Sequence, residues 1–170
     1  KVGLMTTVAY GVGDDIKPQI HHMTNVPVPE LMQRLKWMRS QGVEWLVLET
    51  TSHALAQHRT WGIPYSVAVM TNVSEDHLDR YESFDAYLAA KEIIFNTQSP
   101  TQKAVLNYDH EIVRKVGERV KSKPYWFSAK PLPEGIEGTY IAADGTLHLR
   151  LDGKDREICH PQNWPCLQGE

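Results

Sequence analysis

The 170-residue sequence has little that would connect it to a membrane, to nucleic acid or to an oxidising compartment. No apolar run approaches the length of a membrane span, and the first residues do not combine a charged region with a hydrophobic segment. The formal net charge is only −3, so no extended basic surface is expected. The 2 cysteines, Cys159 and Cys166, fit no metal-binding or redox motif, which favours free thiols in a reducing compartment. We therefore expect a cytoplasmic protein with no nucleic-acid or membrane partner.

The sequence also lacks internal repeats and low-complexity tracts, and its length and 41% hydrophobic content suffice for one domain with a substantial core. Short apolar runs typical of buried strands alternate with segments whose apolar residues recur at helical spacing. This alternation predicts an α/β fold with a mostly parallel sheet flanked by helices. We expect strands at about 2–10, 45–48, 65–70 and 104–106, and helices at about 29–41, 83–96 and 112–120.

The last third of the sequence changes from helical to alternating patterns. Three short segments, at 138–143, 146–151 and 156–160, are separated by Asp-Gly pairs at 144–145 and 152–153. Asp-Gly between alternating segments is a strong signal for a β-hairpin turn. We therefore expect a small antiparallel β meander near the C-terminus, appended to the α/β body.

Two of the predicted buried strands end in polar residues suited to a binding site. Glu49 follows the run 45–48, and Asn72 follows the run that ends at Thr71. Ligands of open α/β sheets bind at the carboxyl ends of parallel strands, so both side chains lie where a site is expected. A carboxylate in this position is more often a solvated or helix-capping residue, so position alone does not establish a binding site.

Lys91 lies in the middle of the apolar stripe of the predicted helix 83–96. It follows Phe84 by seven residues and Tyr87 by four, so it shares their face of the helix. One interpretation is a snorkelling lysine, whose stem packs while the ammonium group reaches water. The other is an amine in a protected site, where desolvation favours the neutral form. A neutral amine can react with carbon dioxide to give a carbamate, an anion able to bind a metal.

The segment 71–79 places His77 among carboxylates. Imidazole nitrogens and carboxylate oxygens are donors suited to a divalent metal ion. Asp76 and Asp79 could instead serve only to favour the first turn of a helix. His77 is therefore a candidate metal ligand whose assignment depends on the neighbouring motifs.

Four motifs, taken in order, resemble the central domain of the Mur ligase family. They are LETTSHAL at 48–55, QHR at 57–59, TNVSEDHLD at 71–79 and YLAAK at 87–91. The separations of 28 residues from Glu49 to His77 and of 14 from His77 to Lys91 match the spacing of that family's metal glutamate, metal histidine and carbamylated lysine. The resemblance covers about residues 2–107 well and the hairpin region only loosely.

The resemblance implies an ATP-dependent amide ligase of peptidoglycan precursor synthesis that uses Mg²⁺. In this family ATP phosphorylates the terminal carboxylate of a UDP-N-acetylmuramoyl-peptide, and an incoming amino acid attacks the acyl phosphate. The motifs are most similar to those of members that add the third residue, to a UDP-N-acetylmuramoyl-dipeptide. The implied partners are thus a UDP-N-acetylmuramoyl-peptide and an amino acid. The sequence indicates neither which amino acid is added nor the oligomeric state of the protein.

The resemblance also implies roles for individual residues. Glu49 and His77 match ligands of the magnesium that bridges the nucleotide phosphates, and Lys91 matches the lysine whose carbamate holds a second magnesium. These three are the expected catalytic and metal-binding residues, and Asn72 is expected to support the nucleotide site. The expected substrate-binding residues are Thr24, Asn25, Thr51, Gln57 and Arg59.

The sequence departs from the family pattern in four places. It contains no G-x-x-G-K-[ST] phosphate-binding loop, and the family's C-terminal, amino-acid-binding domain is absent as well. Arg80-Tyr81-Glu82 replaces a common Tyr-His-Gly, and 24–27 (TNVP) matches Thr-Thr-Pro only in part. We therefore expect residues 1–170 to be a truncated central, ATP-binding domain that is inactive by itself.

Three other functions stay open at this level. One is another ligase of the same superfamily, such as the D-glutamate-adding enzyme or a folylpolyglutamate synthase. A second is a non-catalytic Mur-like binding domain. The third is a metal-dependent hydrolase, but the 8 histidines show no HExxH-type spacing.

Overall fold

The computed structural model describes residues 1–20, 23–74 and 80–160, and the chain divides into two compact units. Unit 1 comprises Lys1–Ile63 and Asp85–Ile93, and unit 2 comprises Pro64–Phe84 and Ile94–Glu170. His77 and Cys166 lie outside the described residues. Within the described ranges, no helix is both long and apolar enough to cross a membrane.

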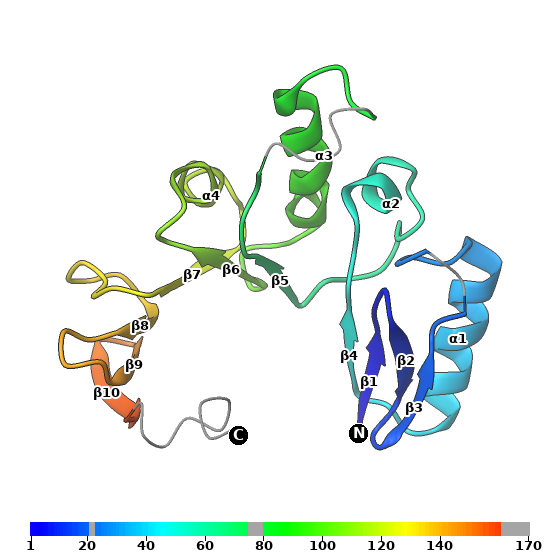
Figure 1. Cartoon of the computed structure of the whole chain (residues 1–170), viewed down its shortest axis with the longest axis horizontal. Helices are drawn as coiled ribbons and strands as arrows, with labels where there is room; N and C mark the ends of the chain where they lie inside the picture. Colours follow the sequence, from blue (N-terminus) through cyan, green and yellow to red (C-terminus); the bar gives the residue numbers. More distant parts are fainter. Residues whose placement is uncertain (21–22, 75–79, 161–170) are drawn as a thin grey trace. The chain divides into compact units, whose positions relative to one another are not determined.

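Unit 1 contains a four-stranded sheet with the strand order β3-β2-β1-β4 (Figure 1). β1 pairs with β4 in parallel and with β2 antiparallel, and β2 pairs antiparallel with β3. The elements are β1 (Val2–Met5), β2 (Ala9–Val12), β3 (Asp15–Pro18), α1 (Val28–Ser40), β4 (Trp45–Leu48) and α2 (Ser52–Ala56).

The prediction of one strand over residues 2–10 is wrong, because the chain turns back after β1. The backbone N–H of Thr6 donates to the carbonyl oxygen of Ala9 (2.8 Å), and the Thr6 hydroxyl oxygen accepts from the N–H of Ala9 (3.0 Å). Threonine hydroxyls that bond nearby backbone groups stabilise turns. The apolar run in the sequence continues through this turn as Val8, which is 75% exposed, and this conceals the turn.

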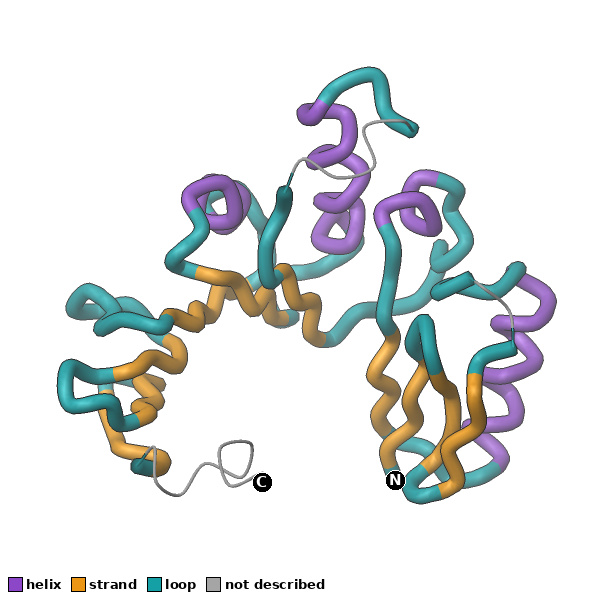
Figure 2. The backbone as a smooth tube through the Cα atoms, in the orientation of Figure 1, coloured by secondary structure: helices purple, strands orange, loops and turns teal. Residues whose placement is uncertain are grey.

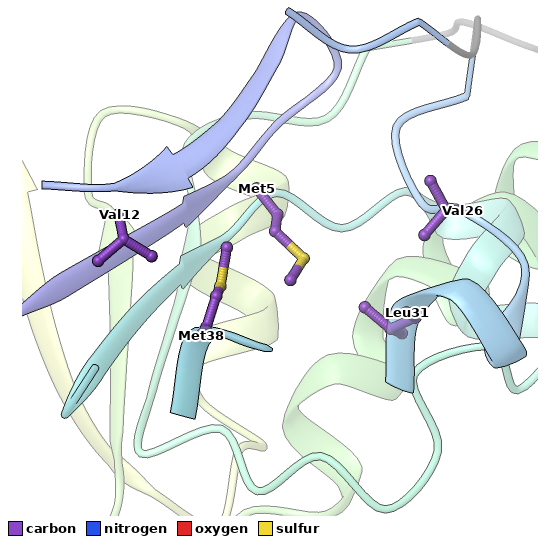
Figure 3. Packing of buried hydrophobic residues seen from close by; sticks show 5 residues of the cluster. All are labelled: Met5, Val12, Val26, Leu31 and Met38. Atoms are coloured by element: carbon purple, nitrogen blue, oxygen red, sulfur yellow. The ribbon is translucent and has the colours of Figure 1, made fainter. Parts of the chain in front are cut away.

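Helix α1 packs on the sheet of unit 1 through its apolar face. Leu31 and Met38 on α1 are each only 2% exposed, and Figure 3 shows both side chains directed toward Met5 of β1. Pro29 lies in the first turn of α1, and Gly42 follows its end with a φ of 76°. Both helix boundaries confirm the prediction, because proline fits the first turn and glycine tolerates a positive φ.

Unit 2 contains a six-stranded sheet with the order β10-β9-β8-β7-β6-β5 (Figure 2). The pairs from β5 to β8 are parallel, and β8, β9 and β10 form an antiparallel meander. The α/β fold with parallel strands and a C-terminal meander is thus confirmed. The elements of unit 2 are β5 (Val67–Met70), β6 (Lys103–Asn107), α4 (Glu111–Gly117), β7 (Lys123–Ser128), β8 (Gly138–Ile141), β9 (Leu147–Leu151) and β10 (Lys154–Cys159). Helix α3 (Phe84–Asn96) is shared, because its residues Asp85–Ile93 belong to unit 1 and its two ends belong to unit 2.

Strand β7 is one of the elements that the sequence analysis missed, as it also missed β3 and α2. Its sequence, KPYWFS, shows no polar–apolar alternation and carries Pro124 as its second residue, which argues against a central strand. The expected helix to residue 120 also ends earlier, at Gly117. A Cβ atom at Gly117 would collide with the ring of Trp126, so the glycine allows α4 to approach β7 closely.

A polar network around Asp155 stabilises the meander. The Asp155 carboxylate accepts hydrogen bonds from the Tyr140 hydroxyl (2.5 Å), the Arg150 Nε (2.9 Å) and the His148 Nδ1 (3.1 Å). The hydrogen bond from Tyr140, followed by those from His148 and Arg150, lowers the pKa of Asp155 to about 2. Arg150 also donates to the carbonyl oxygen of Pro133 (2.6 Å), which ties the loop before β8 to the meander.

Candidate functional site

The candidate site of unit 1 lies where β1 and β4 end. The two strands are parallel, with Met5 opposite Leu48, so their carboxyl ends meet at one edge of the sheet. Glu49 follows β4 directly, and its backbone N–H donates to the carbonyl oxygen of Met5 (2.9 Å). This is the edge at which open α/β sheets bind ligands, and the Glu49 side chain is at its surface.

Thr7, in the turn after β1, binds the carboxylate of Glu49 with two hydrogen bonds. Its backbone N–H donates to Oε2 (2.8 Å) and its hydroxyl donates to Oε1 (2.9 Å). The Thr7 hydroxyl oxygen also lies 2.8 Å from the hydroxyl oxygen of Thr24. The sequence analysis did not find Thr7, because it placed residues 2–10 in one strand. Ending that strand at Met5 would have put Thr7 beside the end of β4.

Asn25 connects three segments of the site through its buried side chain, which is 3% exposed. Its Nδ2 donates to the carbonyl oxygen of Glu49 (2.9 Å). Its Oδ1 accepts from the backbone N–H of Thr51 (2.9 Å) and from the Thr51 hydroxyl (3.2 Å). The Asn25 amide therefore fixes the backbone on both sides of Thr50.

Thr51 starts helix α2, and Arg59 follows that helix. The Thr51 hydroxyl oxygen accepts from the N–H of Ala54 (3.1 Å), which caps the first turn of α2. The Arg59 guanidinium donates to the carbonyl oxygen of Asn25 (3.2 Å). Arg59 therefore joins the hydrogen-bonded cluster formed by Thr7, Thr24, Asn25, Glu49 and Thr51. Gln57, at the C-cap of α2, is exposed and contributes no side-chain hydrogen bond to the cluster within the described chain.

The other predicted site residues lie elsewhere. Lys91 is half-buried on α3, with its Nζ 4.8 Å from the centre of the Tyr87 ring, so the amine is held against its own helix by a cation–π contact. Asn72 follows β5 in unit 2 and is exposed. His77 is outside the described residues, so its predicted metal role is neither supported nor contradicted.

The carboxylate of Glu49 is the group of this cluster that suits a hard divalent cation. Glu49 offers an exposed carboxylate, two of whose roughly four lone-pair positions bond Thr7. Among the described residues, no three His, Cys, Asp or Glu side chains gather as a metal cage. Mg²⁺ is commonly bound by only one or two carboxylates together with substrate phosphates, so a single exposed glutamate fits this ion.

Comparison with known proteins identifies the family. The model of the Mur ligase middle domain matches residues 1–161. The chain belongs to the Mur ligase family. The UDP-N-acetylmuramoyl-L-alanyl-D-glutamate--2,6-diaminopimelate ligase of Clostridium botulinum is 34% identical over 153 residues, which cover 90% of this chain and 29% of the relative. The ligase of the same name from Caldanaerobacter subterraneus subsp. tengcongensis is 33% identical over 130 residues, which cover 76% of this chain and 26% of the relative.

A solved structure gives the same result at the level of the fold. The structure of a UDP-N-acetylmuramoyl-L-alanyl-D-glutamate--2,6-diaminopimelate ligase superposes with a TM-score of 0.69 and 26% sequence identity. The match covers 93% of this Mur ligase chain and 33% of that protein. The chain thus spans about a quarter to a third of the length of these relatives.

Proposed function

We propose that this chain is the central part of a longer ATP-dependent ligase that adds the third amino acid to a UDP-N-acetylmuramoyl-dipeptide. The observation that carries the proposal is the hydrogen-bonded cluster of Thr24, Asn25, Glu49 and Thr51 at the carboxyl ends of β1 and β4, joined through Thr7. These residues come from separate segments of the sequence, and all of them except Thr7 were expected from the family motifs. Their assembly in a chain whose relatives are named as ligases supports a shared function.

The reaction has two steps. A carboxylate oxygen of the dipeptide attacks the γ-phosphorus of ATP and ADP leaves; the amine of the amino acid then attacks the acyl carbon and phosphate leaves. Glu49 would hold a Mg²⁺ ion, which supplies charge stabilisation for the transferring phosphoryl group. Thr51, Gln57 and Arg59, together with Thr24 and Asn25, would hold the muramyl-peptide nucleotide.

The remaining assignments belong to the same proposal. His77 would be a second magnesium ligand, and Asn72 would support the nucleotide site. Lys91 would bind a second magnesium ion after its neutral amine attacks carbon dioxide and loses a proton, which gives a carbamate. The phosphate-binding loop would be supplied by a part of the full-length protein outside these 170 residues. The full-length ligase would act in the cytoplasm.

The direct test uses the full-length protein that contains this chain. It is incubated with ATP, Mg²⁺, a UDP-N-acetylmuramoyl-dipeptide and a panel of amino acids that includes 2,6-diaminopimelate and lysine. We expect phosphate release and a product one residue heavier, detected by mass spectrometry, whereas the 170-residue chain alone should show neither. Absence of product with every amino acid would leave a binding domain as the better interpretation.

Arg59→Ala tests which substrate the cluster binds. An arginine that faces a carboxylate or phosphate contributes roughly 1.5–3 kcal/mol, so KM for the muramyl-peptide nucleotide should rise by about 10- to 100-fold. KM for ATP should stay within about twofold. Arg156→Ala, on exposed β10 of unit 2, is the matched control and should change neither constant. A fall in ATP affinity with an unchanged constant for the nucleotide would contradict the assignment.

A further inference from the structure

The Thr7 side chain is arranged to orient Glu49 rather than to close the turn in which it lies. Thr6 already closes that turn, because its N–H and its hydroxyl both donate to the carbonyl oxygen of Ala9 (2.8 and 3.0 Å) and its hydroxyl oxygen accepts from the N–H of Ala9 (3.0 Å). Thr7 and Glu49 are both exposed, so neither bond is needed to satisfy a buried polar group. The Thr7 hydroxyl therefore has no evident structural task in the hairpin.

Two hydrogen bonds from one residue fix the orientation of a carboxylate. The N–H bonds Oε2 at 2.8 Å and the hydroxyl bonds Oε1 at 2.9 Å, so both oxygens are held and the plane of the carboxylate cannot rotate freely. Within the described ranges, no lysine or arginine forms an ion pair with Glu49. The two bonds come from neutral groups, so the carboxylate keeps its negative charge for a ligand.

The direction of the hydroxyl protons extends this arrangement to Thr24. An ionised carboxylate only accepts, so the single hydroxyl proton of Thr7 points to Glu49. The 2.8 Å contact between the two threonine hydroxyls then requires Thr24 to donate to Thr7. Thr24 is thereby linked to Glu49 through one intermediate hydroxyl.

We propose that Thr7 is a positioning residue that orients the Glu49 carboxylate toward a divalent cation, and that the Thr24 hydroxyl supports it. The identity of the cation as Mg²⁺ rests on the proposed function, but the orientation of Glu49 does not. Residues that hold a metal ligand by hydrogen bonds typically change metal affinity by about 10- to 100-fold when they are replaced. Thr7 does not touch a substrate or reacting atom in this arrangement.

The test measures metal binding directly, in the full-length protein. Mn²⁺, which binds the same oxygen ligands as Mg²⁺, is titrated in the presence of a non-hydrolysable ATP analogue and followed by electron paramagnetic resonance. Thr7→Val keeps the shape and the backbone N–H but removes the hydroxyl, and should weaken Mn²⁺ binding by about tenfold. Thr7→Ser restores the hydroxyl and should bind within about twofold of the wild type. Thr24→Val should have a smaller effect than Thr7→Val.

A structural role would give a different pattern. Thr101→Val, which removes an exposed hydroxyl of unit 2 that lies 2.9 Å from that of Ser99, is the matched control and should leave Mn²⁺ binding unchanged. The proposal is overturned if Thr7→Val binds Mn²⁺ like the wild type, or if Thr7→Ser is as weak as Thr7→Val. In the proposed reaction, Thr7→Val should raise the Mg²⁺ concentration needed for half-maximal activity.

Failure of the positioning role can be separated from failure of the proposed function. If the wild type makes no peptide product but Thr7→Val still weakens Mn²⁺ binding and Thr7→Ser does not, the ligase assignment fails and the positioning role stands. If the wild type is an active ligase and Thr7→Val binds Mn²⁺ normally, the positioning role fails and the ligase assignment stands. A wild-type protein that binds no Mn²⁺ overturns the positioning role.

Discussion

The two units each contain an exposed or half-exposed carboxylate at the centre of a polar network, and the two carboxylates are bonded in opposite ways. Asp155 in the meander accepts from a tyrosine, an arginine and a histidine, so its charge is compensated and three of its roughly four lone-pair positions are filled. Among the residues that the structure describes, the Glu49 carboxylate accepts only from Thr7, through one hydroxyl and one backbone N–H. Asp155 is bonded as a structural group, and Glu49 is bonded as a group that still has capacity for a ligand.

The difference shows how hydrogen bonds can orient a carboxylate without neutralising it. Arg150 brings a full positive charge to Asp155, and with Tyr140 it ties the meander together. Thr7 brings no charge to Glu49, although its two bonds restrict the side chain just as firmly. Thus the number of bonds alone does not separate a binding carboxylate from a structural one, and the charge of the donors must be counted as well.

Exchanging each carboxylate for its amide gives the largest expected contrast between the two units. In the full-length protein, Glu49→Gln should lower kcat for ligation by about a hundred- to a thousandfold, as expected when a group that stabilises transition-state charge is lost. Asp155→Asn should leave kcat unchanged, because the bonds that Asp155 makes within the described part of the chain are to Tyr140, His148 and Arg150 of the meander. Steady-state kinetics of phosphate release measure both effects. Equal losses of kcat in the two variants would contradict the assignment of Glu49 as a ligand-binding carboxylate and Asp155 as a structural one.

Replacement of Asn25 should give the next largest effect, which is a loss of stability around the site and not a loss of a catalytic charge. Asn25→Ala removes the partners of the Glu49 carbonyl group and of the Thr51 N–H and hydroxyl. Each polar group left unsatisfied costs about 1–3 kcal/mol when buried, and these are only partly buried, so we expect a loss of roughly 2–3 kcal/mol. Hydrogen exchange of the amides in β4 and α2 reports the loss locally.

Asn25→Asp is the matched variant, because it keeps the acceptor for Thr51 but replaces the donor to the Glu49 carbonyl oxygen by a buried carboxylate oxygen. Its effect on exchange should therefore be larger in β4, on the Glu49 side, than in α2, whose Thr51 cap keeps its acceptor. If both variants exchange like the wild type, the Asn25 side chain does not hold the site together. Hydrogen exchange in the meander of unit 2 should be unchanged in both variants, which would show that the effect of Asn25 is confined to unit 1.

Much of the fold could be predicted from local patterns. The apolar runs 45–48 and 65–70 and the helix boundary residues Pro29 and Gly42 act through neighbours in the sequence, and the structure confirms two strands and one helix there. The expected burial of both strands is wrong, because alternate residues such as Trp45 and Val69 are 65% and 55% exposed. The division of residues 2–10 into two strands could not be read in the same way, since the turn depends on one hydroxyl within an apolar run. Strand β7 was missed because it depends on its distant pairing with β6 and β8.

The candidate site was predictable to the extent that motifs mark single residues. Glu49 and Thr51 stand in such a motif, and their positions at the end of β4 and the start of α2 agree with the expected strand end. Thr7 stands in no motif, and its role comes only from the parallel register of β1 and β4. The role of Asn25 likewise depends on hydrogen bonds to Glu49 and Thr51, which follow it by 24 and 26 residues in the sequence. The spacing of the motifs does not reveal such long-range bonds.

The smallest effect concerns pH and should appear only in unit 2. The pKa of Asp155 is lowered from 3.8 to about 2, first by the Tyr140 hydroxyl and then by His148 and Arg150. A carboxyl group with a lowered pKa in the folded state stabilises the fold above its unfolded pKa, and this contribution is lost as the pH falls through the folded pKa. Because the Asp155 side chain is 34% exposed, solvent screening limits the contribution to about 1 kcal/mol.

The expected signature is a change in the difference between wild type and Asp155→Asn. The opening free energy of the β9 amides, from hydrogen exchange, should favour the wild type by a constant amount from pH 7 to about pH 4. The difference should then shrink toward pH 2, because the folded wild type and the unfolded chain both become protonated there. The amides of β4 in unit 1 should show no such difference at any pH, because Asp155 makes no bond to that unit within the described chain. A difference that stays constant down to pH 2 would mean that the Asp155 charge adds nothing to the meander.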